Sequence, residues 1–355
     1  MKFYTLSGFL SGRYERRLTI TLFALKLSYF LFAHLFMGHS NVSYVTHRHD
    51  AGWYARIAES GYAEGPIPDL STGQYSEYAF FPAYPMLVRT VGRVTTWDFH
   101  HSAFFVSTLA SWAAYLCLFR LLRRSLGDAK RAFISTVAVL VFPFSIHHSM
   151  PYTESLFLLC MTACFASALR EGAAAFVFWA VLATLTRANG VFLTLPIALF
   201  MLENGVFSPR KYLRLLAFPA ALSAYCAWLK YRTGDAFAFS TAMRAWGREF
   251  NWPWNTLFSN GADFHQVHSW VAVFAFVCLA AMTLQRLRPS FLTMSWVGVL
   301  LPLTTGITVS FGRYMSVLFP FGILFAQYYR LYFLVAIPLH YLVFYLWLTE
   351  SAITY

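Results

Sequence analysis

The sequence predicts an all-α membrane protein that crosses the bilayer many times, and two observations support this fold class. Of its 355 residues, 58% are hydrophobic and 19% aromatic, while only 12% are charged, a balance typical of chains that lie within a bilayer. Apolar runs of spanning length also recur along the chain, at roughly 18–37, 101–122, 130–147, 153–170, 212–231, 267–286, 290–309, 313–329 and 331–349. We therefore expect residues 1–355 to form a single integral membrane domain.

The basic residues support the same class. A formal net charge of +12 would suggest nucleic acid as the partner of a soluble protein, but Lys and Arg fall mostly in short loops between apolar runs. The positive-inside rule explains this distribution, so we expect membrane lipids and no nucleic acid as partners. Arg13, Arg16 and Arg17 precede the first run without a cleavage site behind a short core, which predicts a retained anchor. The five cysteines lie inside apolar runs, where they pack.

Residues 172–203 decide the number of spans. This stretch is apolar, but the sequence TRANG interrupts it at 186–190. The basic loops all lie on the cytoplasmic side only if the stretch crosses twice, which predicts about eleven spans with the N-terminus inside and the C-terminus outside. Two short crossings around Arg187 and Asn189 resemble the broken helices that membrane proteins form where backbone lines a cavity.

This topology places 38–100 outside as one large loop and 232–266 as a second outer loop. In the first loop, a Gly/Pro/Ser-rich bridge at 61–76 separates 47–62 from 78–89, and the latter is too short and too Pro-broken to span. We expect two amphipathic helices here, lying in the membrane interface, where Trp and Tyr are favoured. Most acidic residues fall on this outer side, so an active centre would face it.

Asp50 is the candidate catalytic acid. A helix that starts at Asp50 carries four residues on the same face, at the spacings of a helical stripe: Trp53, Tyr54, Ile57 and Gly61. Glu59 points the opposite way, so Asp50 faces whatever the aromatic stripe faces. The structural alternative is that Asp50 caps the helix and Gly61 ends it.

Further polar residues stand at span ends, where lipid penalises them. Glu154 lies at the start of a span after Tyr152, and it is either a functional acid or a helix-start acid favoured by the dipole. Arg187 and Arg313, with Arg244 and Arg248 in the second outer loop, suit a phosphate group held against the bilayer. The alternative for any single Arg is that it snorkels to the interface.

A metal site is a third alternative. His47 and His49, or His265 and His268, could provide two ligands, but neither pair comes with a clear third ligand in the sequence. No Gly-rich phosphate loop is present, so a nucleotide is not expected as a direct substrate. The cofactor prediction is therefore none, with a divalent metal as the alternative.

Six stretches, in order, carry a resemblance to a known family. They are HDAGWYARIAESGY at 49–62, YAFFPAYP at 78–85, PYTESLF at 151–157, RANG at 187–190, TGDAFAF at 233–239 and RYMSVLFP at 313–320. Together the chain resembles the glycosylphosphatidylinositol mannosyltransferase II family and its prokaryotic relatives. It departs from the eukaryotic members at His49, where they commonly have Trp, and its loops are compact, which suggests a prokaryotic member.

The resemblance implies a GT-C-type glycosyltransferase, a multi-span helical enzyme that takes a sugar from a polyprenyl-phosphate carrier on the non-cytoplasmic side. The family's acid in the first outer loop corresponds to Asp50. Transfer needs a base for the acceptor hydroxyl and stabilisation of the leaving phosphate, and a carboxylate and Arg side chains provide both.

We therefore predict an inverting α-mannosyltransferase that moves mannose from polyprenyl-phosphate-mannose to a lipid-linked or glycan acceptor. Asp50 would be the base, and the donor phosphate would be bound by Arg313, Arg187 and Arg244. Sugar and acceptor hydroxyls would meet Glu154, Tyr152, His49, Trp53, Tyr54 and Asn189. The expected location is a prokaryotic cytoplasmic membrane, or the endoplasmic reticulum in a eukaryote. The alternatives are transfer of another polyprenyl-linked sugar and, in a different class, a lipid or oligosaccharide transporter.

Overall fold

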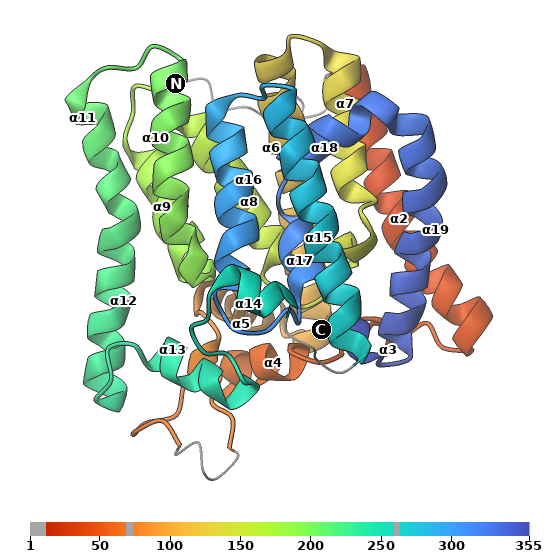
Figure 1. The fold of residues 1–355 in the computed structure, drawn as a ribbon. Coiled ribbons are helices and arrows are strands. Elements are labelled where there is room, and N and C mark those ends of the chain that lie inside the picture. The colour runs from red at the N-terminus through yellow and green to blue at the C-terminus, as the bar shows by residue number, and fades with distance from the viewer. Residues whose placement is uncertain (1–11, 69–73, 259–262, 355) are drawn as a thin grey trace.

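The computed structural model describes residues 12–68, 74–258 and 263–354, and these residues form helices and no strand. The helices of the bundle are α2 (Arg13–Met37), α6 (Phe99–Leu126), α7 (Ala129–Leu140), α8 (Glu154–Ala168), α9 (Ala174–Thr186), α10 (Thr194–Glu203), α12 (Ala217–Thr233), α15 (Asp263–Leu284), α16 (Pro289–Leu303), α18 (Pro320–Phe325) and α19 (Tyr329–Leu348). Most of them run roughly parallel between the two ends of the bundle (Figure 1).

Shorter elements connect the bundle helices. They are the α-helices α3 (Val42–Thr46), α4 (Ala51–Ser60), α5 (Ala83–Thr95), α11 (Pro209–Tyr212), α13 (Ala238–Met243), α14 (Pro253–Phe258) and α17 (Phe311–Ser316), and the 3-10 turns η2 (Glu77–Ala79), η3 (Pro143–His148), η4 (Ala188–Leu193), η5 (Leu213–Leu216), η6 (Arg244–Trp246), η7 (Ala326–Tyr328) and η8 (Ala352–Thr354). Of these elements, α3, α4, α5 and α13 gather at one end of the bundle (Figure 1).

The helices confirm an integral membrane protein. Five helical segments are long and apolar enough to cross a bilayer: Arg13–Met37, Phe99–Leu126, Pro209–Thr233, Gln266–Leu284 and Pro320–Leu348. Four shorter apolar segments lie among them: Glu154–Ala168, Ala174–Thr186, Ala188–Glu203 and Pro289–Leu303. The count of eleven spans stays a prediction.

The apolar stretch 172–203 is divided where the sequence predicted a break. Arg187 has an extended backbone with φ −154° and ψ 141°, and it separates α9 from η4 and α10. Gly190 lies so close to α9 that a Cβ there would stand 2.6 Å from the Ala183 carbonyl oxygen. Beyond α10, Lys211 reaches back to Glu171, just before α9, at 2.6 Å. The chain therefore returns to the end of the bundle from which α9 started.

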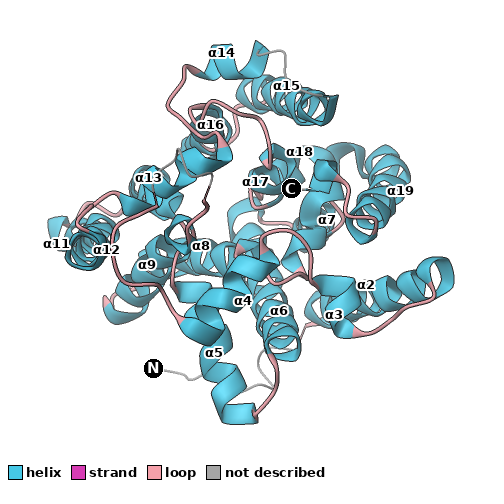
Figure 2. Cartoon of the chain, turned by 90° about the horizontal axis from the view of Figure 1, so that it is seen from below, coloured by secondary structure: helices cyan, strands magenta, loops and turns pink. Residues whose placement is uncertain are grey.

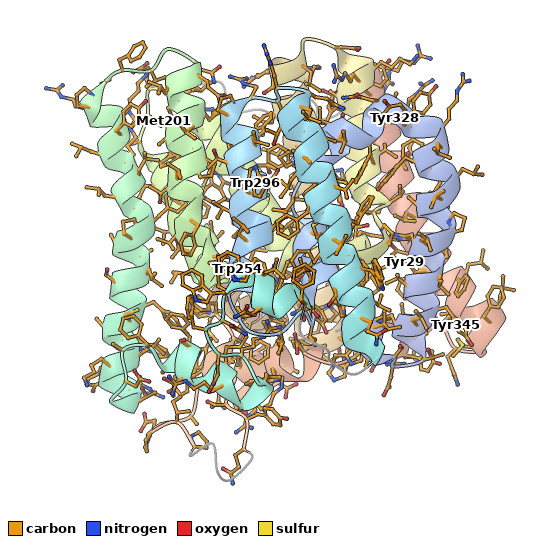
Figure 3. The ribbon with its side chains drawn as sticks, in the orientation of Figure 1. Tyr29, Met201, Trp254, Trp296, Tyr328 and Tyr345 are labelled. Carbon is orange, nitrogen blue, oxygen red and sulfur yellow. The ribbon has the colours of Figure 1, made fainter. Side chains whose placement is uncertain are left out.

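Small residues allow the central helices to pack closely. The buried face of α6 includes Ala103, Ser107, Ala110, Ser111 and Ala114, and such residues let helix backbones approach within a membrane protein. Around this core, large apolar side chains point outward (Figure 3), as on α19, which runs between the ends of the bundle marked by Tyr328 and Tyr345. Leu331, Leu334 and Leu342 on this helix are at least half exposed. Such a surface is suited to lipid.

The first outer loop forms two helices, as predicted. α4 lies across one end of the bundle, and α5 follows it at the same end (Figures 1 and 2). Both helices bury one face: Tyr54 and Ile57 of α4, and Tyr84 and Val88 of α5, are buried. Residues 69–73 of the predicted bridge lie outside the described residues. α13, from the second outer loop, lies at the same end of the bundle (Figure 1) and packs against η2.

Candidate active site

Asp50 stands directly before α4, but its carboxylate does not cap the helix. Its side chain makes no capping hydrogen bond, and Oδ2 accepts instead from Nη1 of Arg313 at 2.7 Å. Gly61 does end α4, as the structural alternative stated. Its φ is 83°, and its N–H donates to the Ile57 carbonyl. As predicted, Ile57 is buried and Glu59 is exposed on the opposite side.

Four charged side chains form a chain of alternating sign. Arg313 bonds Asp50 with Nη1, and its Nε lies 3.2 Å from Oε1 of Glu154. The same Glu154 oxygen accepts from Nη2 of Arg187, whose Nε donates to Oγ1 of Thr153 at 2.8 Å. The Glu154 side chain is fully buried, while that of Arg313 is 8% exposed. Buried charges persist only when paired in this way.

The helix ends explain why these residues meet. Asp50 precedes α4, Glu154 is the first residue of α8, Arg187 follows α9, and Arg313 lies in the short α17. All four positions are therefore at or near breaks in the helical chain, at one end of the bundle. The two acids and two arginines balance in charge, which leaves no excess negative charge for a divalent cation.

Tyr152 supports the turn before α4. Its hydroxyl accepts from the Asp50 N–H at 3.1 Å and donates to the Arg48 carbonyl at 3.2 Å. Its ring lies 5.0 Å from the Arg313 guanidinium. Both hydrogen bonds go to backbone, so Tyr152 positions Asp50 in this structure. Tyr54 is also packed inside, and burial raises its pKa, so its phenol is neutral at neutral pH.

His49 and Asn189 differ in their surroundings. His49 has a left-handed backbone, φ 50°, and its Nε2 lies 2.9 Å from Oγ1 of Thr354. Burial lowers the pKa of His49 to about 4, so the ring is neutral at neutral pH. Within the described residues, the buried atoms without a hydrogen-bond partner include Oδ1 of Asn189, Nη1 of Arg187 and Oε2 of Glu154. Buried polar atoms without a hydrogen-bond partner are rare in native structures, and they are typical of functional sites.

Trp53 lies one turn after Asp50 and is partly buried. Its ring stacks on Phe80 at 5.8 Å and meets Trp246 edge-on at 5.7 Å. Trp246 comes from the second outer loop, so the two outer loops contact each other beside the site.

Arg244, one of the two predicted cations of the second outer loop, does not join the site. Its side chain is exposed and makes no ion pair or hydrogen bond within the part of the chain that the structure describes. Gly247, with φ 71°, reverses the chain after η6, and Arg248 then turns inward. Arg248 donates to Oγ1 of Thr305 at 3.0 Å and to the Val309 carbonyl at 3.1 Å.

The Tyr314 ring lies close to three guanidinium groups. The sequence analysis assigned no role to this residue. Its ring centroid is 5.4 Å from Arg187, 5.7 Å from Arg313 and 5.8 Å from Arg248. Tyr314 follows Arg313 directly, so its neighbourhood was visible in the sequence, while the contact with Arg248 depends on the tertiary fold.

Of the two histidine pairs, the structure describes both side chains only for His47 and His49. Among the described residues, no three His, Cys, Asp or Glu side chains gather in a way that could hold a metal ion. The His47 ring lies against His100 at 4.7 Å, while His49 turns toward Thr354. The side chain of His265 lies outside the described residues.

Comparisons with known proteins identify the fold. No family model matches the sequence, and no curated protein matches it. Among solved structures, it is similar to ArnT from Cupriavidus metallidurans bound to undecaprenyl phosphate, with a TM-score of 0.53 and 13% identity, covering 99% of this chain and 77% of ArnT. The apo state of the same ArnT gives a TM-score of 0.50 and 13% identity, covering 94% and 76%.

This similarity shows that the chain is an integral membrane protein with the GT-C fold, as the sequence predicted. At the end of this fold the structure places one partly accessible carboxylate, a second buried carboxylate, and three arginines around Tyr314. Such a set can accept a proton and can bind a phosphate group.

Proposed function

We propose that this protein is a polyprenyl-phosphate-sugar-dependent glycosyltransferase, and specifically an inverting α-mannosyltransferase that uses polyprenyl-phosphate-mannose. The observation that carries the proposal is the Asp50 carboxylate, which is free of the helix cap and held 2.7 Å from Arg313. ArnT, which has the same fold, was solved with undecaprenyl phosphate bound. The six family-like stretches of the sequence support mannose and membership of the glycosylphosphatidylinositol mannosyltransferase II family.

In the proposed reaction, an acceptor hydroxyl attacks the anomeric carbon of the donor. A bond forms between the acceptor oxygen and that carbon, the bond from the carbon to the phosphate oxygen breaks, and the hydroxyl proton passes to Asp50. Polyprenyl phosphate leaves with the negative charge, which guanidinium groups stabilise. No redox step or further reactant is needed.

Arg313 would link the two halves of this reaction. It now bonds Asp50, yet a phosphate dianion or monoanion is an equally good partner for a guanidinium group. Donor phosphate would therefore draw Arg313 away from Asp50 and toward Arg248 and Arg187, beside Tyr314. The Asp50 carboxylate would then lose its ion pair with Arg313 when the donor is bound, which leaves Oδ2 free to accept the proton of the acceptor hydroxyl.

The proposed location follows from the same assignment. A carrier with an isoprenoid tail is held by the apolar helices, so the donor and the catalytic end meet at the bilayer surface. We propose the extracytoplasmic face of a prokaryotic cytoplasmic membrane, with a lipid-linked or glycan acceptor.

The test is transfer of radiolabelled mannose from polyprenyl-phosphate-mannose to endogenous acceptors in membranes with matched expression of each variant. We expect activity in the wild type, loss by at least a thousandfold in Asp50→Asn, and near wild-type activity in Asp98→Asn. Asp98 is an exposed acid of the same loop whose helix-capping role Asn preserves.

Each other outcome removes one part of the proposal. Transfer of a different polyprenyl-linked sugar, and not mannose, would exclude the mannosyltransferase. Full activity of Asp50→Asn would exclude Asp50 as the base. The absence of transfer from every polyprenyl-phosphate sugar, with the protein folded, would refute the glycosyltransferase and favour a transporter.

A further inference from the structure

A pocket beside the site has the chemistry of a sugar-binding site. It has a volume of about 340 Å³ and lies between α4 and the chain around η2, where its lining includes Trp53, Arg56, Glu64, Tyr75, Glu77 and Tyr78. We propose that this pocket binds a sugar unit of the acceptor, next to the unit whose hydroxyl reaches Asp50. This inference rests on the proposed function and adds the substrate class of a second subsite.

One wall of the pocket is aromatic. The Tyr75 ring lies 4.6 Å from Trp246 and 6.5 Å from Trp53, and 48% of Tyr75 is exposed. Trp246 and Phe80 support Trp53 from behind at 5.7 and 5.8 Å. The rings are therefore fixed by their neighbours while part of Tyr75 stays open to a ligand. The C–H face of a sugar ring packs well on such a surface.

A carboxylate and a guanidinium group lie next to the aromatic residues of the pocket. Oε2 of Glu77 and Nη2 of Arg56 are 3.8 Å apart, too far for a direct hydrogen bond. Glu77 is held in place because its Oε1 accepts from the Ala63 N–H at 2.7 Å. A sugar hydroxyl that approaches both groups from the pocket can donate to Oε2 of Glu77 and accept from Arg56. Hydrogen bonds to charged groups of this kind are among the strong ones.

The charge of the pocket favours a neutral ligand. Arg56 is balanced by Glu77, and Glu64 is paired with Arg232 at 2.7 Å. No excess positive charge is left for a phosphate among these residues, whereas a polyol satisfies donors and acceptors alike. A sugar is therefore a better occupant than an anionic headgroup.

The position along α4 connects the pocket to the reaction. Trp53 follows Asp50 by three residues and so shares its side of the helix, and Arg56 lies one turn further. At a rise of 1.5 Å per residue, these residues are about 4.5 and 9 Å beyond Asp50 along the axis. The Arg56 guanidinium lies over the Trp53 ring, 5.8 Å from its centroid. A sugar seated on Tyr75, beside this Arg56–Trp53 pair, would therefore leave the next unit of an acceptor over Asp50.

The test separates acceptor binding from donor binding. We would measure the acceptor KM, the donor KM and kcat for Tyr75→Ala and Arg56→Ala. We expect the acceptor KM to rise at least tenfold, with the donor KM and kcat within twofold of wild type. The control is Trp97→Ala, which removes an equally exposed aromatic residue, also 48%, at a different outer pocket. An unchanged acceptor KM in both variants, or a rise confined to the donor KM, would overturn the inference.

A direct binding measurement keeps the inference testable if transfer fails. Saturation-transfer NMR with an α-linked manno-oligosaccharide and the detergent-solubilised chain would report contact without any reaction. A signal in wild type and Trp97→Ala that is lost in Tyr75→Ala and Arg56→Ala supports the subsite even if the donor assignment is wrong. No signal in wild type, or the same signal in all four proteins, refutes it.

Discussion

The buried chain of charges predicts an order of stability losses. Glu154 contacts both arginines, so Glu154→Gln leaves Arg187 buried without a carboxylate, while Arg313 keeps Asp50. Removing one partner of a buried ion pair costs about 3–5 kcal/mol of the free energy of unfolding. Asp50→Asn instead leaves Arg313 with Glu154, and the Asp50 side chain is 17% exposed. Asp50→Asn should therefore lower the free energy of unfolding by about 1 kcal/mol, which is the contribution of a typical hydrogen bond.

Equilibrium unfolding in detergent micelles measures this order. Glu171→Gln is the control, because the Glu171 side chain is 89% exposed and a surface pair contributes about 0–1 kcal/mol. The double variant Glu154→Gln/Arg187→Met should recover about 2 kcal/mol of the loss, since contacting residues couple by amounts of this size. The reasoning fails if Glu154→Gln costs no more than the control, or if the double variant loses the full sum of the single losses.

Three further outcomes follow from the structure. Gly190→Ala should destabilise the protein by about 1–3 kcal/mol through overpacking, because the added Cβ would meet the backbone of α9. The control is Gly172→Ala, where an added Cβ has no heavy atom within 4 Å and should not destabilise the protein. Thermal unfolding of the two variants tests this difference. The lowered pKa of His49, about 4, stabilises the fold fully above pH 6.5 and progressively less as the pH falls toward 4. His49→Asn, which tolerates the left-handed backbone, should flatten that decline in a pH series of unfolding midpoints, and an unchanged decline would contradict this account. Arg248→Ala should lower sugar transfer at least tenfold and Arg244→Ala less than twofold; equal effects would count against the contact with Tyr314.

Composition and periodicity were enough to predict much of the fold. The apolar runs predicted the membrane class, and the polar interruption at 186–190 predicted the break between α9 and α10. Hydropathy alone did not reveal the breaks within other runs. α7 ends at Leu140 before Pro143, and α17 ends at Ser316 before Pro320. Both prolines were visible, and a Pro disfavours helix in the residue before it, so these breaks could have been predicted.

The candidate site was predicted residue by residue, but not as an arrangement. Polar residues at span ends drew attention to Asp50, Glu154, Arg187 and Arg313, because lipid penalises them. Their pairing depends on tertiary structure: Asp50 and Arg313 are 263 residues apart. Which of Arg244 and Arg248 points toward the site depends on the turn after η6. Gly247, with its positive φ, makes this turn, and its effect on the two side chains is not visible in the sequence.

The break between α9 and α10 also bears on how the chain is made. α9 has 13 residues and α10 has 10, so each helix is shorter than the roughly 20 residues that a bilayer needs. We therefore expect the pair to enter the membrane together, as a hairpin that carries Arg187 at its tip. Glu154 is synthesised 33 residues earlier, so the acid is in place before its arginine arrives. Losing that acid would reduce the yield of inserted protein, in addition to the stability of the finished fold.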